Sequence, residues 1–357
     1  MTQKQRPSVD GLRTEPLSIV RVGFIGLGAR GMKALLQMAA IPQVRMTALC
    51  DTSAERLSQA LAALSEQCAG KERPDCTNDS SDICRQTDVD LVYVCTDWAS
   101  HAAICVDAMR HGKHVAVEVP AALTWEELQT IVRTAEESQR HCILLENCCF
   151  EPQVEEAVAA IRAGKIGEVV HAEGNYYHTL GDRWTRWRLD TNRRYRGDLY
   201  PTHELGPICQ ALGIGRDDRL QTLVSMDSAA LTGPLEYERA TGEVCPDFQN
   251  GDHTTTLIRT ERGRTILLKH NVLTPQPYER QLSFIGTKGV IRLNDEGSAS
   301  HAEMTLRMNQ SIIHSLTHGL PMPISVYDLA TWCAVGPLSR RSIEGGFVPV
   351  QFPRIRE

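Results

Sequence analysis

The first 150 residues alternate short apolar runs with stretches in which apolar residues recur at helical spacing. The runs are rich in β-branched residues, and they predict strands at residues 20–25, 46–49, 91–94, 114–117 and 143–145. Before the last of these runs, Thr124 and Glu127 stand at capping-box spacing ahead of a periodic apolar segment, which predicts an amphipathic helix. Strands that alternate with helices are typical of βαβ units and a parallel sheet.

The pattern changes after about Asn147. A helical segment at residues 153–163 is followed by strand-like segments at residues 169–177, 254–259, 265–270 and 280–285. Gly286, Thr287, Lys288 and Gly289 separate two apolar runs, which predicts a hairpin turn. This part of the chain therefore predicts an α+β domain with a largely antiparallel open sheet.

Composition favours a globular protein with a small-molecule partner. The chain has 357 residues, 42% hydrophobic and 23% charged, which suits two domains of ordinary size. A formal charge of -6 gives no electrostatic reason to bind nucleic acid or an anionic membrane surface. The sequence has no apolar run of about 18 residues, so we expect no membrane span.

Twelve cysteines lie mostly inside apolar patterns and show no paired C-x-x-C spacing. We therefore interpret most of them as core thiols and expect no metal site. Free thiols suit a reducing compartment, which predicts a cytoplasmic location; a periplasmic or secreted location is the alternative if a signal peptide has been removed.

A glycine motif follows the first predicted strand. Gly26, Gly28 and Gly31 form G-x-G-x-x-G around Ala29 and Arg30, between a strand and a helix. The first glycine permits a tight turn, the second lets the backbone approach a pyrophosphate, and the third lets the helix pack on the strand. The motif predicts a Rossmann dinucleotide site to which all five residues contribute.

The cofactor predicted for this site is NAD. Asp51 ends the next strand about 20 residues later, where a carboxylate accepts hydrogen bonds from the adenosine ribose and repels a 2′-phosphate. Arg30 and Arg56 are the residues that would favour NADP instead. In sum we expect an α/β fold with a flexible leader at residues 1–18, a Rossmann domain at 19–147, and an α+β domain for substrate and oligomerisation at 148–357.

Two further strand ends are expected to line the nicotinamide side, because ligands of open α/β sheets bind beyond the carboxyl ends of strands. One carries Thr96, Trp98 and His101, and the other carries Glu118 and Val119. All five are candidate cofactor-binding residues. Packing is the alternative role for Trp98, and helix capping is the alternative for His101.

Together the glycine motif, the Thr96 to His101 stretch and the Glu118 to Pro120 segment resemble the Gfo/Idh/MocA family of sugar-type oxidoreductases. Members of that family usually have a lysine where this chain has Val119, and the lysine assists proton transfer from a substrate hydroxyl. The departure disfavours an ordinary dehydrogenase mechanism.

A narrower resemblance, to glycoside hydrolase family 109, rests on five segments in the same order: residues 118–122, 145–150, 173–178, 187–189 and 197–203. It implies hydrolysis of glycosides, typically α-linked N-acetylgalactosaminides, with a tightly held NAD that is regenerated in each turnover. The implied route is oxidation at sugar C3, elimination across C1 and C2, addition of water and re-reduction. It needs one base for the C3 hydroxyl and another for the C2 proton.

The resemblance also suggests catalytic residues. The period of two along a strand places Gly174, Tyr176 and His178 on one face, and the resemblance makes Tyr176 the candidate C2 base. An ordinary tyrosine pKa near ~10 means that its phenolate needs local stabilisation. His203 is the candidate for proton transfer at the C3 hydroxyl, since imidazole titrates near neutrality.

Four further residues are candidate substrate contacts by the same resemblance: Glu146, Arg188, Tyr200 and Tyr278. Glu146 is expected to orient substrate or nicotinamide, with a surface carboxylate as the alternative. Tyr200 lies three residues before His203, so both side chains are expected in one cavity. Arg188 belongs to a run of arginines, for which a solvated or interface surface is the alternative role. The run consists of Arg183, Arg186, Arg188, Arg193, Arg194 and Arg196.

The chain departs from the family at several positions. The family commonly has His-Asp-Leu-Arg at residues 178–181, where this chain has His-Thr-Leu-Gly, and it has Asn and Gly at Asp198 and Glu204. These changes bear on the sugar pocket.

The alternatives to an NAD-dependent glycosidase are a sugar or cyclitol dehydrogenase and a non-catalytic nucleotide sensor. Family analogy suggests a homo-oligomer, dimer or tetramer, formed through the open face of the second sheet.

Overall fold

The structure is a computed structural model that describes residues 6–68, 72–181, 184–294 and 297–355. It divides into two compact units, each made of two stretches of chain. The first unit comprises Met1–Asn147 and His301–Ala330, and the second comprises Cys148–Ser300 and Thr331–Glu357. This division differs from the predicted 148–357 domain, because residues 301–330 pack with the first unit.

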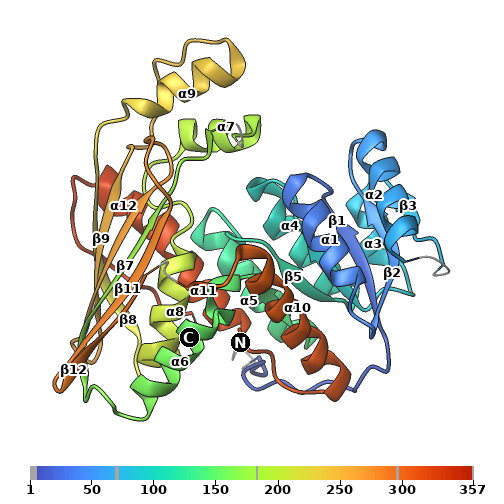
Figure 1. Cartoon of the computed structure of the whole chain (residues 1–357), viewed down its shortest axis with the longest axis horizontal. Helices are drawn as coiled ribbons and strands as arrows, with labels where there is room; N and C mark the ends of the chain where they lie inside the picture. The colour runs from blue at the N-terminus through green and yellow to red at the C-terminus, as the bar shows by residue number, and fades with distance from the viewer. Residues whose placement is uncertain (1–5, 69–71, 182–183, 295–296, 356–357) are drawn as a thin grey trace, which may run out of the picture. The chain divides into compact units, whose positions relative to one another are not determined.

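The first unit is built on a six-stranded sheet whose neighbouring strands are all parallel, in the order β3-β2-β1-β4-β5-β6. This is the order of a Rossmann fold, so the predicted fold class is confirmed. Its elements (Figure 1) are β1 (Val20–Ile25), α1 (Ala29–Ala39), β2 (Val44–Cys50), α2 (Ala54–Gln67), β3 (Asp75–Thr77), α3 (Ser80–Arg85), β4 (Leu91–Val94), α4 (Trp98–Arg110), β5 (His114–Val117), α5 (Trp125–Ser138) and β6 (Cys142–Leu144).

Helix α10 (His301–His318) returns from the C-terminal part of the chain to this unit. Its buried face includes Met304, Met308 and Ile312, which repeat every four residues and pack against α1 and β1. A helix that is amphipathic in sequence does not reveal which core its apolar face joins. Helix α11 (Val326–Cys333) follows and begins in the same unit.

Residues 6–18 differ from the expected flexible leader. The Arg6 guanidinium pairs with Glu136 at 2.9 Å, and the backbone N–H of Val9 donates to the Tyr327 hydroxyl at 3.1 Å. Farther on, the N–H of Leu17 donates to the carbonyl of Leu316 at 3.1 Å. The segment is therefore tied to α5, α10 and α11 although its composition is polar.

The second unit is built on a seven-stranded sheet in the order β12-β11-β7-β10-β9-β8-β13. All neighbouring pairs are antiparallel except β7 and β10, and the predicted hairpin joins β11 to β12. Its elements are η1 (Asn147–Phe150), where the unit begins, α6 (Pro152–Arg162), β7 (Val169–Tyr177), α7 (Arg186–Arg194), α8 (Thr202–Leu212), β8 (Leu220–Asp227), α9 (Thr232–Thr241), β9 (Thr254–Thr260), β10 (Thr265–Asn271), β11 (Glu279–Gly286), β12 (Gly289–Leu293), α12 (Val335–Glu344) and β13 (Val350–Gln351).

Helices α6, α8 and α12 pack against one face of this sheet. The approach of α8 is close, since a Cβ on Gly174 would lie 2.7 Å from that of Glu204. At one end of the sheet, α7 and α9 lie together (Figure 1) and contact each other. The opposite face of the sheet carries alternate residues of the strands, including the exposed Leu257 and Met226.

No helix in the described ranges is long and apolar enough to cross a membrane. All twelve cysteines lie within those ranges, and each is a free thiol. Nine of them are buried, as the prediction of core thiols requires.

Two buried histidines in the first unit predict acid sensitivity. The ring centroids of His114 and His141 are 5.0 Å apart, and the backbone N–H of His141 donates to Nδ1 of His114 at 3.1 Å. Burial, followed by the charge of His141, lowers the pKa of His114 from 6.5 to about 3, and burial lowers that of His141 to about 4. The folded protein therefore keeps both rings neutral.

Because the unfolded chain binds these protons first, stability is complete above about pH 6.5 and falls as the pH drops toward 4. Each histidine is expected to remove about 1.4 kcal/mol of unfolding free energy per pH unit in that window. Urea unfolding at several pH values measures the slope. His114→Asn keeps an acceptor for the His141 N–H but does not titrate, so it should give a shallower slope. The control His111→Asn changes an exposed histidine and should leave the slope unchanged. Equal slopes in the two variants would refute the explanation.

Candidate functional site

The three glycines of the first loop are required for different reasons. Gly26 has φ +93°, and a Cβ there would lie 2.5 Å from the carbonyl oxygen of Cys95. A Cβ on Gly31 would lie 2.0 Å from the carbonyl oxygen of Gly26, so the turn itself excludes it. Gly28 has an ordinary φ of -64° and no atom within 4 Å of the place a Cβ would take. Space for a ligand, and not the fold, explains Gly28.

Asp51 stands beside this loop at the end of β2. One carboxylate oxygen accepts from the N–H of Leu27 at 2.7 Å, and the other accepts from the N–H of Ser53 at 2.8 Å. Arg56 reaches to 3.7 Å from the same carboxylate. The carboxylate is thus fixed at the tip of the second strand, where an adenosine ribose binds in Rossmann domains.

Arg30 is already committed within the protein. Its Nε donates to Glu118 at 2.9 Å, and its terminal nitrogens lie 3.4 Å from the hydroxyl of Thr305. The negative charge of Glu118 raises the pKa of Arg30 despite the opposing effect of burial, which is the largest single influence. An arginine whose charge is already paired with Glu118 does not favour the binding of a 2′-phosphate, so the geometry agrees with NAD.

His101 joins the two loops at the nicotinamide side. It lies in α4 and is fully buried, with Nδ1 2.8 Å from the carbonyl of Pro120 and Nε2 3.2 Å from that of Thr96. Burial lowers its pKa and so favours the neutral ring, which has one N–H to donate to these two carbonyls. Asp97 caps the helix instead of His101. The neighbouring Trp98 is buried, consistent with packing.

Glu146 follows β6 in the first unit and is fully buried. The alternative of a surface carboxylate is therefore wrong. A carboxylate removed from water is retained where it binds a specific partner, so its burial keeps it among the candidate site residues.

In the second unit, aromatic and imidazole rings gather around Tyr176. We define the Tyr176 cluster as Tyr176, His178, Tyr200, His203, His270 and Tyr278. The centroid of the Tyr176 ring lies 4.9 Å from those of His178 and His203 and 6.2 Å from that of Tyr200. Sequence spacing predicted the faces of these residues correctly, since Tyr177 points elsewhere, with its ring 5.7 Å from that of His253.

Local geometry explains the cluster. Tyr176 lies on the face of β7 that α8 covers, and His178 follows the end of that strand directly. Tyr200 and His203 stand at the start of α8 around its N-cap, Pro201. Tyr278 precedes β11 and is half exposed, with its ring 6.1 Å from that of Tyr176.

Sequence reasoning did not include His270. Strand β10 pairs in parallel with β7 so that His270 lies beside Tyr176, and their rings stack at 6.0 Å. The local signal in the sequence was the alternation along β10, in which His270 falls on the buried face together with Ile266 and Leu268.

The environment of Tyr176 disfavours a phenolate. Burial, then the nearby Tyr200 and Tyr278, raise the pKa of Tyr176 well above its usual 10. This direction is opposite to the stabilisation that a tyrosinate base requires. In the structure Tyr176 is therefore a neutral phenol, and its role as a base needs a neighbour that takes its proton.

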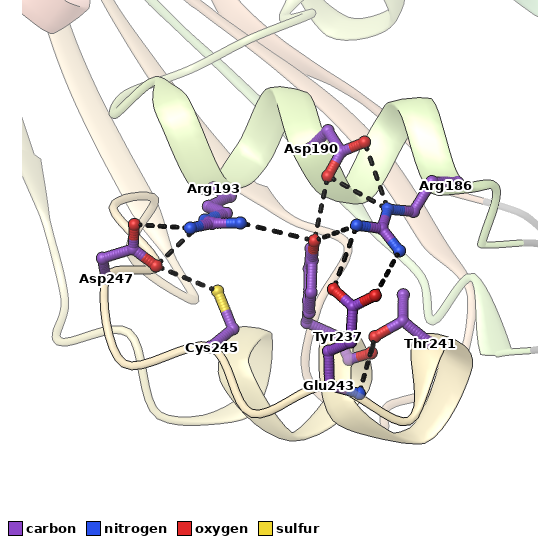
Figure 2. A network of polar contacts seen from close by, with 8 residues as sticks. All are labelled: Arg186, Asp190, Arg193, Tyr237, Thr241, Glu243, Cys245 and Asp247. Atoms are coloured by element: carbon purple, nitrogen blue, oxygen red, sulfur yellow. Dashed lines mark hydrogen bonds and ion pairs between the residues drawn. The ribbon is translucent and has the colours of Figure 1, made fainter.

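Most of the arginine run is structural. Figure 2 shows the Tyr237 hydroxyl between Arg186 and Arg193: it accepts from Arg186 at 2.8 Å and donates to Asp190 at 3.1 Å. Arg193 pairs with Asp247 at 2.8 Å. Since Tyr237 lies in α9 and both arginines lie in α7, this network fastens α9 and the loop after it to α7.

Of the remaining arginines, Arg196 pairs with the buried Asp227 at 2.7 Å. Arg188 stacks on the Trp187 ring, 4.4 Å from its centroid. Arg183 lies outside the described residues. Arg186, Arg193 and Arg196 thus belong to contacts within the chain, and Arg188 retains a proposed ligand role.

The network of Figure 2 also bears on the site. Tyr237, Cys245 and Phe248, from α9 and the loop after it, belong to the same buried hydrophobic cluster as Tyr176 and Trp184. Leu180 is partly buried against this cluster. It belongs to residues 178–181, where the sequence differs from that of the family it resembles.

Comparison with known proteins covers nearly the whole chain. Residues 153–297 and 292–356 match the C-terminal domain of glycosyl hydrolase 109, and residues 20–145 match the NAD-binding Rossmann fold of an oxidoreductase family. A glycosyl hydrolase family 109 protein of Porphyromonas gingivalis is 40% identical, over 96% of this chain and 86% of its own length. Glycosyl hydrolase family 109 protein 1 of Bacteroides thetaiotaomicron is 39% identical with the same coverage.

Solved structures share the fold. An oxidoreductase domain protein from Kribbella flavida has a TM-score of 0.79 at 17% identity, covering 95% of this chain and all (100%) of its own. A scyllo-inositol dehydrogenase from Lactobacillus casei, solved with NAD(H) and scyllo-inositol, has a TM-score of 0.75 at 18% identity, covering 93% and 99%. The first unit is an NAD-binding Rossmann domain, as predicted.

Proposed function

This chain belongs to glycosyl hydrolase family 109, a family of glycoside hydrolases with an NAD-binding domain, and we propose that it cleaves α-N-acetylgalactosaminides without net redox change. The reaction proposed is transient oxidation at C3, elimination across C1 and C2, addition of water and re-reduction. The observation that carries the proposal is the contact of Tyr176 with two imidazoles, His178 and His203. Two proton transfers at adjacent sugar carbons need two such groups.

The proton path follows from the high pKa of Tyr176. Nδ1 of His178 lies 3.3 Å from the carbonyl of Thr179, and we propose that it donates its hydrogen to this oxygen, with Nε2 as the accepting nitrogen. We propose that Tyr176 accepts the C2 proton while it passes its own proton to His178, so that a free phenolate does not form. His203 accepts the proton of the C3 hydroxyl. Bound NAD supplies the oxidising equivalent at C3 and its later return.

The residues proposed to hold NAD are those of the first unit. The glycine loop with Ala29 and Arg30 is proposed to face the pyrophosphate and Asp51 the ribose, while Thr96, Trp98, His101, Glu118 and Val119 stand at the nicotinamide side. In these proposed roles His101 acts by holding the loops. The substrate contacts proposed are Glu146, Arg188, Tyr200 and Tyr278.

The alternative function is that of a sugar or cyclitol dehydrogenase, and a panel of aryl α- and β-glycosides distinguishes the two. Purified protein without added NAD is expected to release the aryl alcohol from an N-acetylgalactosaminide with no accumulation of reduced nicotinamide. Absence of hydrolysis, with NADH formed when free sugars and excess NAD are supplied, would establish a dehydrogenase. Val119, in place of a proton-relaying lysine, supports the glycosidase.

We also propose that the open face of the second sheet forms a homo-oligomer. Leu257 and Met226 are exposed there, and the half-buried Leu267 pairs with Leu257 on the neighbouring strand. Leu257→Arg is expected to yield monomers in light scattering, because an unpaired charge in an interface costs several kcal/mol. The control Leu235→Arg changes an equally apolar, exposed residue of α9. A wild-type monomer, or an unchanged mass for Leu257→Arg, would reject this interface.

The proposed location is the cytoplasm. Twelve free thiols, nine of them buried, suit a compartment in which disulfides do not form. Fractionation of the native source, with antibody detection, tests this placement; recovery outside the cytoplasm would reject it.

A further inference from the structure

Beside His270 of the Tyr176 cluster lies a buried carboxyl group that the proposed reaction does not use. Asp198 precedes α8 and is fully buried, and His270 is buried beside it on β10. The Oδ1 of Asp198 is 3.4 Å from the Nδ1 of His270. Within the described residues, neither oxygen of Asp198 nor the Nε2 of His270 has a hydrogen-bond partner.

This environment does not support an ionised carboxylate. A carboxylate removed from water needs several donors or a cation to offset a desolvation cost of several kcal/mol. The backbone N–H of Asp198 donates away from the side chain, to the hydroxyl of Ser339 on α12. Lys269, next to His270 in β10, points to the other face of the sheet, where it pairs with Glu173 at 3.7 Å.

The groups that face His270 are neutral aromatic rings and other imidazoles. Tyr176 on β7 stacks on it, and Tyr200 meets its ring edge-on at 4.8 Å. The charges that His178, His203 and His253 would carry if protonated disfavour a proton on His270. An ion pair of Asp198 with a protonated His270 would thus bury two ions with a single long contact between them.

We propose that Asp198 is a protonated carboxylic acid whose hydrogen is directed to Nδ1 of His270, and that the two act as a neutral positioning pair. The pKa directions agree, since burial raises the pKa of Asp198 to about 8 and lowers that of His270 to about 3. With Nδ1 as the acceptor, His270 carries its own hydrogen on Nε2.

The pair separates the roles of three imidazoles. His270 keeps one tautomer and stays uncharged behind Tyr176 and Tyr200, so that proton transfer is left to His178 and His203. This consequence for catalysis rests on the proposed function, whereas the protonation state of Asp198 does not.

Infrared spectroscopy of protein labelled with ¹³C-aspartate tests the protonation state without any substitution. The expected result is a carbonyl band of a protonated aspartic acid that persists at pH 7 and shifts with the label, which excludes the buried glutamates. Asp198→Asn is expected to remove the band. A labelled protein that shows only carboxylate bands at pH 7 would overturn the proposal, whatever the enzyme hydrolyses.

The positioning role is tested by two substitutions of similar size. The amide of Asp198→Asn still donates to Nδ1, whereas Asp198→Leu does not, so kcat is expected to fall at least about tenfold further in the leucine variant, the effect of one lost buried hydrogen bond. Only the leucine variant should change the shape of the pH profile of kcat. Equal losses and equal profile changes in both would show that an anionic Asp198 is required.

Discussion

Tyr176→Phe is expected to lower kcat for glycoside hydrolysis by about 10²- to 10⁴-fold, the usual contribution of a positioned acid or base. The substitution removes only the hydroxyl, so the contacts of the ring with His178, His203 and His270 persist. Because Tyr176 is proposed to take the C2 proton, KM should change far less than kcat. Steady-state kinetics with an aryl glycoside measure both constants.

Tyr177→Phe is the matched control for this prediction. Tyr177 is the next residue of β7 and faces the opposite side, where its ring lies beside that of His253. Its loss of a hydroxyl should leave kcat near the wild-type value. If Tyr176→Phe kept more than a tenth of the activity, or if both variants lost it equally, the C2 base would have to be another residue.

Gly28→Ser is expected to weaken NAD binding by roughly 10- to 100-fold without destabilising the protein free of NAD. Serine is a favoured N-cap, and the φ of Gly28 is one that any residue adopts. A Cβ there meets no protein atom within 4 Å, so we expect the added side chain to intrude on a bound ligand rather than on the protein. Such overpacking costs about 1–3 kcal/mol, which corresponds to that range of affinity.

Two measurements test this prediction, the NAD content of purified protein and the thermal unfolding of protein stripped of NAD. Gly31→Ala provides the contrast, because its Cβ would collide with the carbonyl of Gly26 and should lower the stability of the stripped protein as well. Normal NAD content in Gly28→Ser would mean that the pyrophosphate does not pass over this glycine.

The sequence was most informative where the information is local. Strands β1, β4 and β5 were predicted at their observed bounds because each is a mostly apolar run buried within a parallel sheet. By contrast β3, which is short, polar and largely exposed at the sheet edge, has no apolar pattern to detect. The assignment of α10 to the first unit depends on tertiary packing alone.

The same distinction holds in the candidate site. The positions of Tyr176 and His178 relative to each other follow from the period of a strand, and those of Tyr200 and His203 follow from their spacing at a helix start. His270 joins them only through the pairing of β10 with β7, which sequence periodicity does not specify. The pKa direction of Tyr176 likewise depends on burial by residues distant in sequence.

Hydrolysis of an aryl α-N-acetylgalactosaminide in D₂O, without added NAD, tests the central claim most directly. The mechanism removes the C2 proton to a side chain that exchanges with solvent, whereas the hydrogen of C3 is stored and returned. The released sugar is therefore expected to carry deuterium at C2 and none at C3, as read by proton NMR. Complete hydrolysis with no deuterium at C2 would contradict an elimination mechanism and the role of Tyr176 with it.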